Sequence, residues 1–137
     1  MKKYLLNLSL LIITAFYGCD NKELPVKLDI DGSKYFSGTF KSVNSDNLTG
    51  TVSLDISNRY YICSTNLPYG RGAGKLELND ITINFIDTLF YVVPALYGPT
   101  CVLSGQYNYE FKGLNLKIWK EMSEGSIVYD LKLTKTN

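Results

Sequence analysis

Histidine is absent from this chain of 137 residues. Its absence excludes histidine-based catalytic triads, imidazole metal sites and a histidine pH switch. A strong excess of one charge is also missing, because 14 basic residues face 13 acidic ones and the formal net charge is +1. Domains that bind nucleic acid usually carry a basic patch or stripe. We therefore expect no nucleic acid among the partners.

The chain also lacks an apolar run long enough to span a membrane as a helix, which takes about 20 residues. The longest mostly apolar stretch covers residues 4–16 and is shorter than this. A basic segment, Met1 to Lys3, precedes the run, and the small residue Gly18 follows it, directly before Cys19. A basic head, an apolar middle and a small residue at the break are typical of a secretory signal peptide.

The sequence Phe16, Tyr17, Gly18, Cys19 resembles a relaxed form of the bacterial lipoprotein signal. In that family the cysteine becomes the lipidated N-terminus after cleavage. The resemblance implies a signal peptide over residues 1–18, followed by the lipidated Cys19. An ordinary secretory signal with an incidental cysteine is the alternative.

If the signal is of the lipoprotein kind, residues 19–23 contain the lipidated cysteine and a polar tether, and residues 24–137 form a single β-barrel domain. The acylated N-terminus would hold that domain on a lipid bilayer. The expected location is the bacterial cell envelope, with the inner membrane, outer membrane and cell surface all open.

Sustained helical periodicity is absent after residue 24, and alternation of apolar and polar residues takes its place. Such alternation predicts strands. Residues 24–30 are predicted to form an extra N-terminal strand, which Pro25 confines to a sheet edge. The eight strands predicted after it cover residues 35–43, 48–56, 60–64, 74–78, 81–87, 101–111, 114–119 and 126–134. Eight strands without a helix favour an all-β antiparallel barrel or sandwich.

Three short links fix which residues face inward. Partners that flank a two-residue loop point to the same side of the sheet, and two-residue loops are predicted at residues 79–80 and 112–113. A three-residue loop over residues 57–59 keeps an arginine out of the interior. The inward pairs that follow are Leu78 with Ile81, Phe111 with Leu114, and Ile56 with Tyr60.

The connections divide between the two ends of this meander. At the closed end, all three links are turns of two or three residues. At the open end, the links are longer and cover residues 44–47, 65–73, 88–100 and 120–125. The two longest are rich in apolar and aromatic residues, and exposing them would be costly unless they contact something. The open end is therefore the predicted functional region.

Gly38, Thr39 and Phe40 resemble the Gly-x-Trp motif of the lipocalin-like superfamily of small barrels, with Phe in place of Trp. The resemblance implies an eight-stranded up-and-down barrel and either the binding of small apolar ligands or a role as an envelope interaction module. A two-sheet β-sandwich fits the same alternation and is the alternative fold. Pairing between the first and eighth strands separates the two.

Six residues at the open end are candidates for ligand binding: Tyr69, Arg71, Asp87, Phe90, Tyr91 and Tyr97. Asp87 shares the inward parity of Phe85 and could pair with Arg71 or with a ligand cation; capping the turn into Thr88 is the alternative. The loop aromatics could stack on a ligand, or the loops could fold over the barrel as a lid.

Cys63 and Cys101 remain beside Cys19. An exported protein permits a disulfide between them, but two intervening strands separate them by about 14 Å along the sheet. Two separate, half-buried thiols are the alternative. Two cysteines without histidine give no reason to expect a metal site.

The sequence thus favours a non-enzymatic envelope lipoprotein, without a cofactor, that binds a small apolar or aromatic-stacking ligand at its open end. The alternative is a protein–protein or inhibitor module that docks its long apolar loop into an envelope partner. Aromatic residues predicted to lie inside are Phe36, Phe40, Tyr60, Phe85, Tyr107, Phe111 and Tyr129. An empty interior would favour the ligand, and a packed interior would favour the partner.

Overall fold

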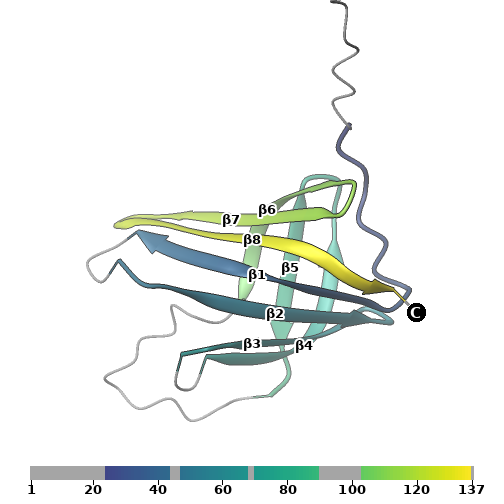
Figure 1. The fold of residues 1–137 in the computed structure, drawn as a ribbon, viewed down its shortest axis with the longest axis horizontal. Coiled ribbons are helices and arrows are strands. Elements are labelled where there is room, and N and C mark those ends of the chain that lie inside the picture. Colours follow the sequence, from purple (N-terminus) through teal and green to yellow (C-terminus); the bar gives the residue numbers. More distant parts are fainter. Residues whose placement is uncertain (1–23, 44–46, 68–69, 90–102, 137) are drawn as a thin grey trace, which may run out of the picture.

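Eight antiparallel strands wind in sequence order into one closed barrel (Figure 1). The computed structural model describes residues 24–43, 47–67, 70–89 and 103–136, and these residues contain no helix. The strands are β1 (Lys34–Val43), β2 (Thr49–Ser57), β3 (Tyr60–Thr65), β4 (Arg71–Leu78), β5 (Thr82–Asp87), β6 (Gly105–Lys112), β7 (Asn115–Met122) and β8 (Gly125–Thr136). In this part of the chain, no helix could cross a membrane.

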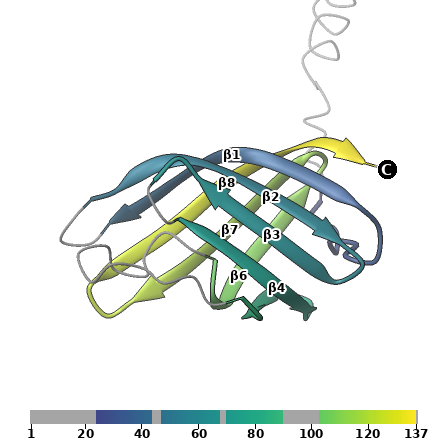
Figure 2. The same cartoon turned by 90° about the horizontal axis from the view of Figure 1, so that it is seen from below.

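Closure of the barrel depends on the pairing of β1 with β8, which runs from Lys34 opposite Thr136 to Val43 opposite Ser126. This pairing confirms the all-β, up-and-down barrel and rules out the sandwich. Figure 2 shows the strands running obliquely across the barrel, as the closure of a twisted sheet requires.

Alternation along each strand produces the core. In β2, for example, Val52, Leu54 and Ile56 are buried and the residues between them are not. Burying one large aliphatic or aromatic side chain contributes about 1.5–3 kcal/mol. The repeated pattern around the barrel therefore selects the inward face of every strand.

Aromatic rings fill the middle of the barrel. Phe40 lies 5.9 Å from Tyr129, and Tyr129 lies 6.1 Å from Tyr107, measured between ring centroids. Phe85 then contacts Tyr107 at 5.8 Å and Tyr61 at 4.9 Å, both edge to face. The interior is thus packed by rings that come from five different strands.

The β2–β3 turn differs from the prediction and reverses the faces of β3. Asn58 and Arg59 form a two-residue turn with φ of 50° and 65°, so Ser57 pairs with Tyr60 and Ile56 pairs with Tyr61. Positive φ at both central residues is the geometry that suits a two-residue hairpin. Tyr61 is therefore buried, and the prediction that Tyr60 lies inside was wrong.

The other two turns at the closed end are also displaced from their predicted positions. Leu78 pairs with Ile83 rather than Ile81, and Phe111 pairs with Leu116 rather than Leu114. Each partner moves by two positions along its strand, so the faces of the strands are kept. The two residues left in the turns, Ile81 and Leu114, are exposed instead of buried.

At the open end, the β7–β8 connection is shorter than predicted. Met122 pairs with Gly125, which leaves only two residues in the turn instead of residues 120–125. Gly125 adopts a φ of 145°, which glycine tolerates without a steric penalty.

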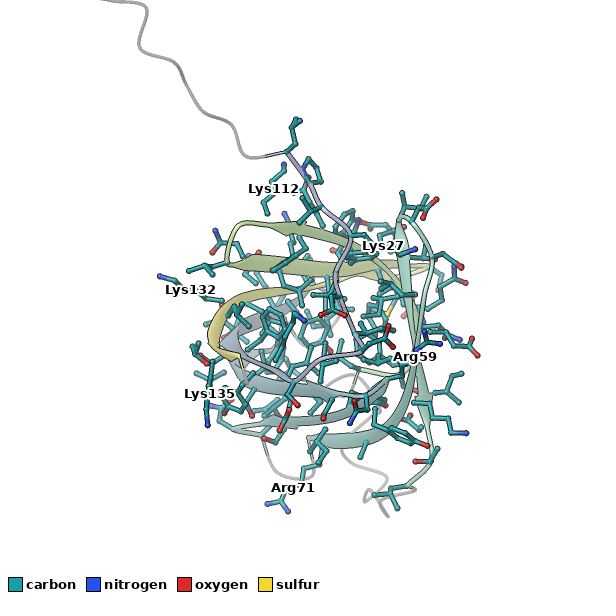
Figure 3. All side chains as sticks on the ribbon, turned by 90° about the vertical axis from the view of Figure 1, so that its right-hand side faces the viewer. Lys27, Arg59, Arg71, Lys112, Lys132 and Lys135 are labelled. Carbon is teal, nitrogen blue, oxygen red and sulfur yellow. The ribbon has the colours of Figure 1, made fainter. Side chains whose placement is uncertain are left out.

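Residues 24–33 contain no strand, so the predicted N-terminal edge strand was wrong. This segment crosses the closed end as a strap (Figure 3). Leu28 and Ile30 are buried against the core, Val26 donates a backbone hydrogen bond to Phe111, and Ile30 accepts one from Arg59. The physical reason is closure: β1 already pairs on both sides, so the barrel offers no free edge to an added strand.

Candidate functional site

Tyr61 and Asp87 form a hydrogen-bonded pair inside the open end of the barrel. The Tyr61 hydroxyl donates to the Asp87 carboxylate and also lies 3.1 Å from the carbonyl oxygen of Leu103. Burial, and after it the hydrogen bond to Asp87, raises the pKa of Tyr61 well above its ordinary value because both disfavour the charged phenolate. Tyr61 therefore stays a neutral donor, and Asp87 has an internal partner.

Asp87 consequently takes neither of the predicted roles beside Arg71 or Thr88. Arg71 is exposed on the outside of β4, and Figure 3 shows it pointing away from the barrel. The amide of Thr88 donates to the carbonyl of Ala73, which satisfies that amide without a side-chain cap. The predicted inward direction of Asp87 nevertheless agrees with its bond to Tyr61.

Cys63 lies close to this pair and is fully buried. Burial is the main cause that raises the pKa of the Cys63 thiol from 9.0 to about 12, while a hydrogen bond from the Leu103 backbone acts in the opposite direction. Leu103, which lies just before β6, is thus buried beside Cys63. Cys101 lies outside the described residues, and its pairing with Cys63 stays a prediction.

Two further inward residues near the open end were not singled out by the sequence. The Lys120 ammonium lies 5.3 Å from the centre of the Tyr107 ring, a favourable cation–π contact. The Ser42 hydroxyl is buried and has no hydrogen-bond partner among the described residues. Alternation along β1 and β7 could have found both, because Ser42 continues the parity of Phe40 and Lys120 that of Ile118.

An apolar surface covers the outside of β3, β4 and β5 and is called here the β3–β5 face. Its exposed members are Tyr60 and Ile62 on β3 and Ile86 on β5, and the buried Ala73 of β4 lies between these strands. Ile62 pairs with Ala73 in the ladder, and Lys75 of β4 pairs with both Tyr60 and Ile86. Ile62 is 63% exposed and Tyr60 is 53% exposed.

This face was not predicted from the sequence, because the expected three-residue turn over residues 57–59 pointed Tyr60 inward. The signal that could have corrected it is the pair of glycines in β4. Tyr61 lies opposite Gly74, and Cys63 lies opposite Gly72, where the missing side chains leave room for buried neighbours. Placing the large residues of β3 opposite glycines would have selected the observed face.

Pockets lined by described residues lie along the outside of the barrel. One follows the strap and is lined by residues such as Ile30, Arg59 and Leu78. Two others lie over Gly38, one toward Asp130 on β8 and one toward Ser64 on β3. None of these three opens into the ring-filled interior.

The remaining predicted site residues, Cys19, Tyr69, Phe90, Tyr91, Tyr97 and Cys101, lie outside the described residues. Within the described ranges, no group of histidine, cysteine, aspartate and glutamate is arranged to hold a metal ion. No protein-family model matches the chain, and neither the curated proteins nor the solved structures contain a significant match.

Proposed function

We propose that this protein is a non-enzymatic, lipocalin-like lipoprotein of the bacterial cell envelope that recognises a protein partner through the β3–β5 face. Acylation at Cys19 anchors it, and the barrel serves as a rigid support. The observation that carries this proposal is the packed interior, where the chain of rings from Phe40 to Tyr61 occupies the space that a ligand would need. Recognition is then left to the outer surface and the open-end loops.

The β3–β5 face has the composition of a protein-binding surface. Ile62 and Ile86 lie on either side of β4, and Lys75 lies between Tyr60 and Ile86. Further charged residues border the face at Arg71 on β4 and at Asp55 on β2. Protein interfaces commonly combine an apolar, aromatic-containing centre with a polar rim. The complementary partner is a protein with an apolar patch bordered by charges of both signs.

The groups inside the open end favour a structural role over catalysis. Asp87 is engaged by the Tyr61 hydroxyl, and a thiol with a pKa of about 12 at Cys63 is protonated near neutral pH. A nucleophilic cysteine requires the thiolate. A role in stabilising the barrel therefore explains why these residues are present, and no catalytic role is needed.

The test replaces Tyr60 and Ile62 together with Thr, which keeps strand propensity while removing apolar surface. The matched control replaces Tyr35 and Val43 of β1 with Thr, one tyrosine and one aliphatic residue that are also exposed. Both variants should keep the thermal unfolding temperature. Only the Tyr60/Ile62 variant should lose a partner that cross-links to β3–β5 in intact cells, identified by mass spectrometry of cross-linked peptides.

Three outcomes would contradict the proposal. Cross-links that map elsewhere, or equal partner recovery from both variants, would exclude the β3–β5 face. Cross-links only between two copies of the chain would replace a heterologous partner with self-association. A small apolar molecule extracted in stoichiometric amount from the purified protein would restore the ligand hypothesis at the open end.

A further inference from the structure

Four large aliphatic side chains are exposed together at the closed end. Leu24 and Val26 belong to the strap and are 79% and 54% exposed, while Ile81 and Leu114 lie in hairpin turns and are 71% and 52% exposed. We refer to these four residues as the closed-end patch. Turn positions normally favour glycine and small polar residues. Isoleucine and leucine at these positions therefore indicate a surface that another molecule covers.

Backbone hydrogen bonds to β6 bring the members of the patch together. The Val26 amide donates to the carbonyl of Phe111 over 2.9 Å, and the carbonyl of Ile81 accepts from the amide of Tyr109 over 3.1 Å. Leu114 follows directly in the turn that ends β6. The strap and both hairpins therefore lie beside the same half of β6, and the apolar side chains that they carry there are exposed.

The described part of the chain begins at this same end. Leu24 is the first described residue, and in Figure 3 the strap that it begins passes Lys112 and Lys27. Five residues separate Leu24 from the proposed lipid attachment, counting Cys19 itself. Five extended residues reach at most about 18 Å, so acylation would hold the closed-end patch next to the bilayer surface.

Two lysines near the closed-end patch form ion pairs with acidic residues. Lys27 pairs with Asp80 at 3.4 Å, and Lys112 pairs with Glu110 at 2.7 Å. Both of these lysines therefore have an acidic partner. Lys132, which lies opposite Asn115 in the β7–β8 ladder beside Leu114, is a further exposed cation.

We infer that the closed-end patch docks on the lipid bilayer, with Leu24, Val26, Ile81 and Leu114 at the level of the headgroups and upper acyl chains, so that the open end points away from the membrane. This inference rests on the proposed anchoring at Cys19. Exposed apolar side chains that bind at an interface enter the headgroup and acyl boundary by about 5–10 Å.

The test measures which end of the acylated protein contacts lipid. A fluorophore is attached to Cys at Asn115→Cys, beside Leu114, or at Glu124→Cys in the β7–β8 turn, both exposed positions. Cys101→Ser is the background, since Cys63 is buried. In phosphatidylcholine vesicles that contain a lipid with a nitroxide quencher, the label at 115 should be quenched at least about twofold more than the label at 124, because the quencher reaches only the interfacial layer.

Substituting the patch should abolish that difference while the protein stays anchored. Ile81→Ser with Leu114→Ser should bring quenching at 115 down to the level at 124, although the variant still sediments with the vesicles. The control, Ile62→Ser with Leu89→Ser, removes two residues of comparable exposure elsewhere and should leave the quenching at 115 unchanged.

Equal quenching at both ends, or no effect of the Ile81/Leu114 substitution, would overturn the docking inference while leaving the anchor intact. Failure of the acylated preparation to sediment with vesicles would instead refute the anchor, and with it the docking. Dimerisation through the patch in the unacylated Cys19→Ser protein, seen by analytical ultracentrifugation and lost on patch substitution, would assign the surface to a second copy.

Discussion

The direction of the Asp87 side chain could be predicted from the sequence, but its hydrogen-bond partner could not. Asp87 was predicted to point inward from its parity with Phe85, and its bond to Tyr61 agrees with that direction. Its partner could not be predicted, because Tyr61 lies two strands away and its orientation depends on two residues of positive φ at Asn58 and Arg59. A tight turn with an arginine gives little sequence signal for that geometry.

Cys63 should resist alkylation in the folded protein. With its pKa raised from 9.0 to about 12, the thiolate fraction at pH 8 falls about a thousandfold relative to an unperturbed thiol. In a Cys101→Ser background, iodoacetamide should label Cys63 only after denaturation, as measured by intact mass. Rapid labelling of the native protein would show that the thiol is accessible.

The same shift makes stability fall as pH rises. The folded state holds the Cys63 proton more tightly than the unfolded state, so this contribution is complete below pH 9 and is lost as pH rises toward 12. Between about pH 8 and 10, the urea midpoint of the Cys101→Ser protein should decrease more than that of Cys63→Ala with Cys101→Ser. Parallel pH profiles for the two would contradict the burial argument.

Ser42 offers an opportunity for stabilisation. Its hydroxyl is fully buried and finds no hydrogen-bond partner in the part of the chain that the structure describes, so folding removes it from water without compensation. Ser42→Ala should leave stability unchanged or raise it by up to about 1 kcal/mol in urea unfolding. A loss of more than about 1 kcal/mol would mean that the hydroxyl has a partner in the native protein.

At the scale of strands and turns, alternation predicted the elements well and the turns less well. Each of the eight strands was expected close to its observed position, and the inward residues Phe85 and Ile83 were assigned correctly. Two turns were predicted at the wrong positions because Ile81 and Leu114 are apolar and were therefore expected to be buried, whereas both are exposed. The local sequence does not distinguish an apolar turn residue that is exposed on the outer surface from one that is buried in the core.

Gly38 marks a position where two strands approach closely. A Cβ atom at Gly38 would overlap the carbonyl oxygen of Asp130 on β8, whereas one at Gly32 would meet only the side-chain ends of Asp29 and Lys34. Gly38→Ala should therefore destabilise the barrel by about 1–3 kcal/mol, and Gly32→Ala should stay within about 0.5 kcal/mol. Urea unfolding of both variants checks this, and equal effects would count against close approach as the cause.

At the scale of the whole molecule, closure was predictable and the strap was not. The meander and the matched parities implied a barrel, and the β1–β8 ladder agrees. The alternation of Leu24, Val26, Leu28 and Ile30 was real, but alternation describes which side chains are buried and not what the backbone pairs with. Even burial followed the alternation only in part: Leu28 and Ile30 are buried and cover the core at one end, whereas Leu24 and Val26 are exposed and belong to the closed-end patch.

The overall charge bears on how the molecule would rest on lipid. Removal of residues 1–18 takes away Lys2 and Lys3, so the formal net charge changes from +1 to −1. The two ion pairs beside the closed-end patch add no net charge, and the exposed Lys132 adds one positive charge near Leu114. The docking inference assigns binding to apolar contact, which salt does not screen.

Vesicle composition and ionic strength separate this mechanism from electrostatic binding. Quenching of the label at Asn115→Cys should be the same with pure phosphatidylcholine and with added phosphatidylserine. It should also persist from about 0.05 M to about 0.5 M salt, although the Debye length shortens severalfold.

A charge added to the patch itself should remove the contact with lipid. Leu114→Glu should abolish quenching on both lipids, since a carboxylate resists transfer into the interface, whereas Glu124→Gln at the open end should change nothing. Quenching that appears only with phosphatidylserine and disappears with salt would show that lysines, rather than the four aliphatic side chains, hold the closed end to the membrane.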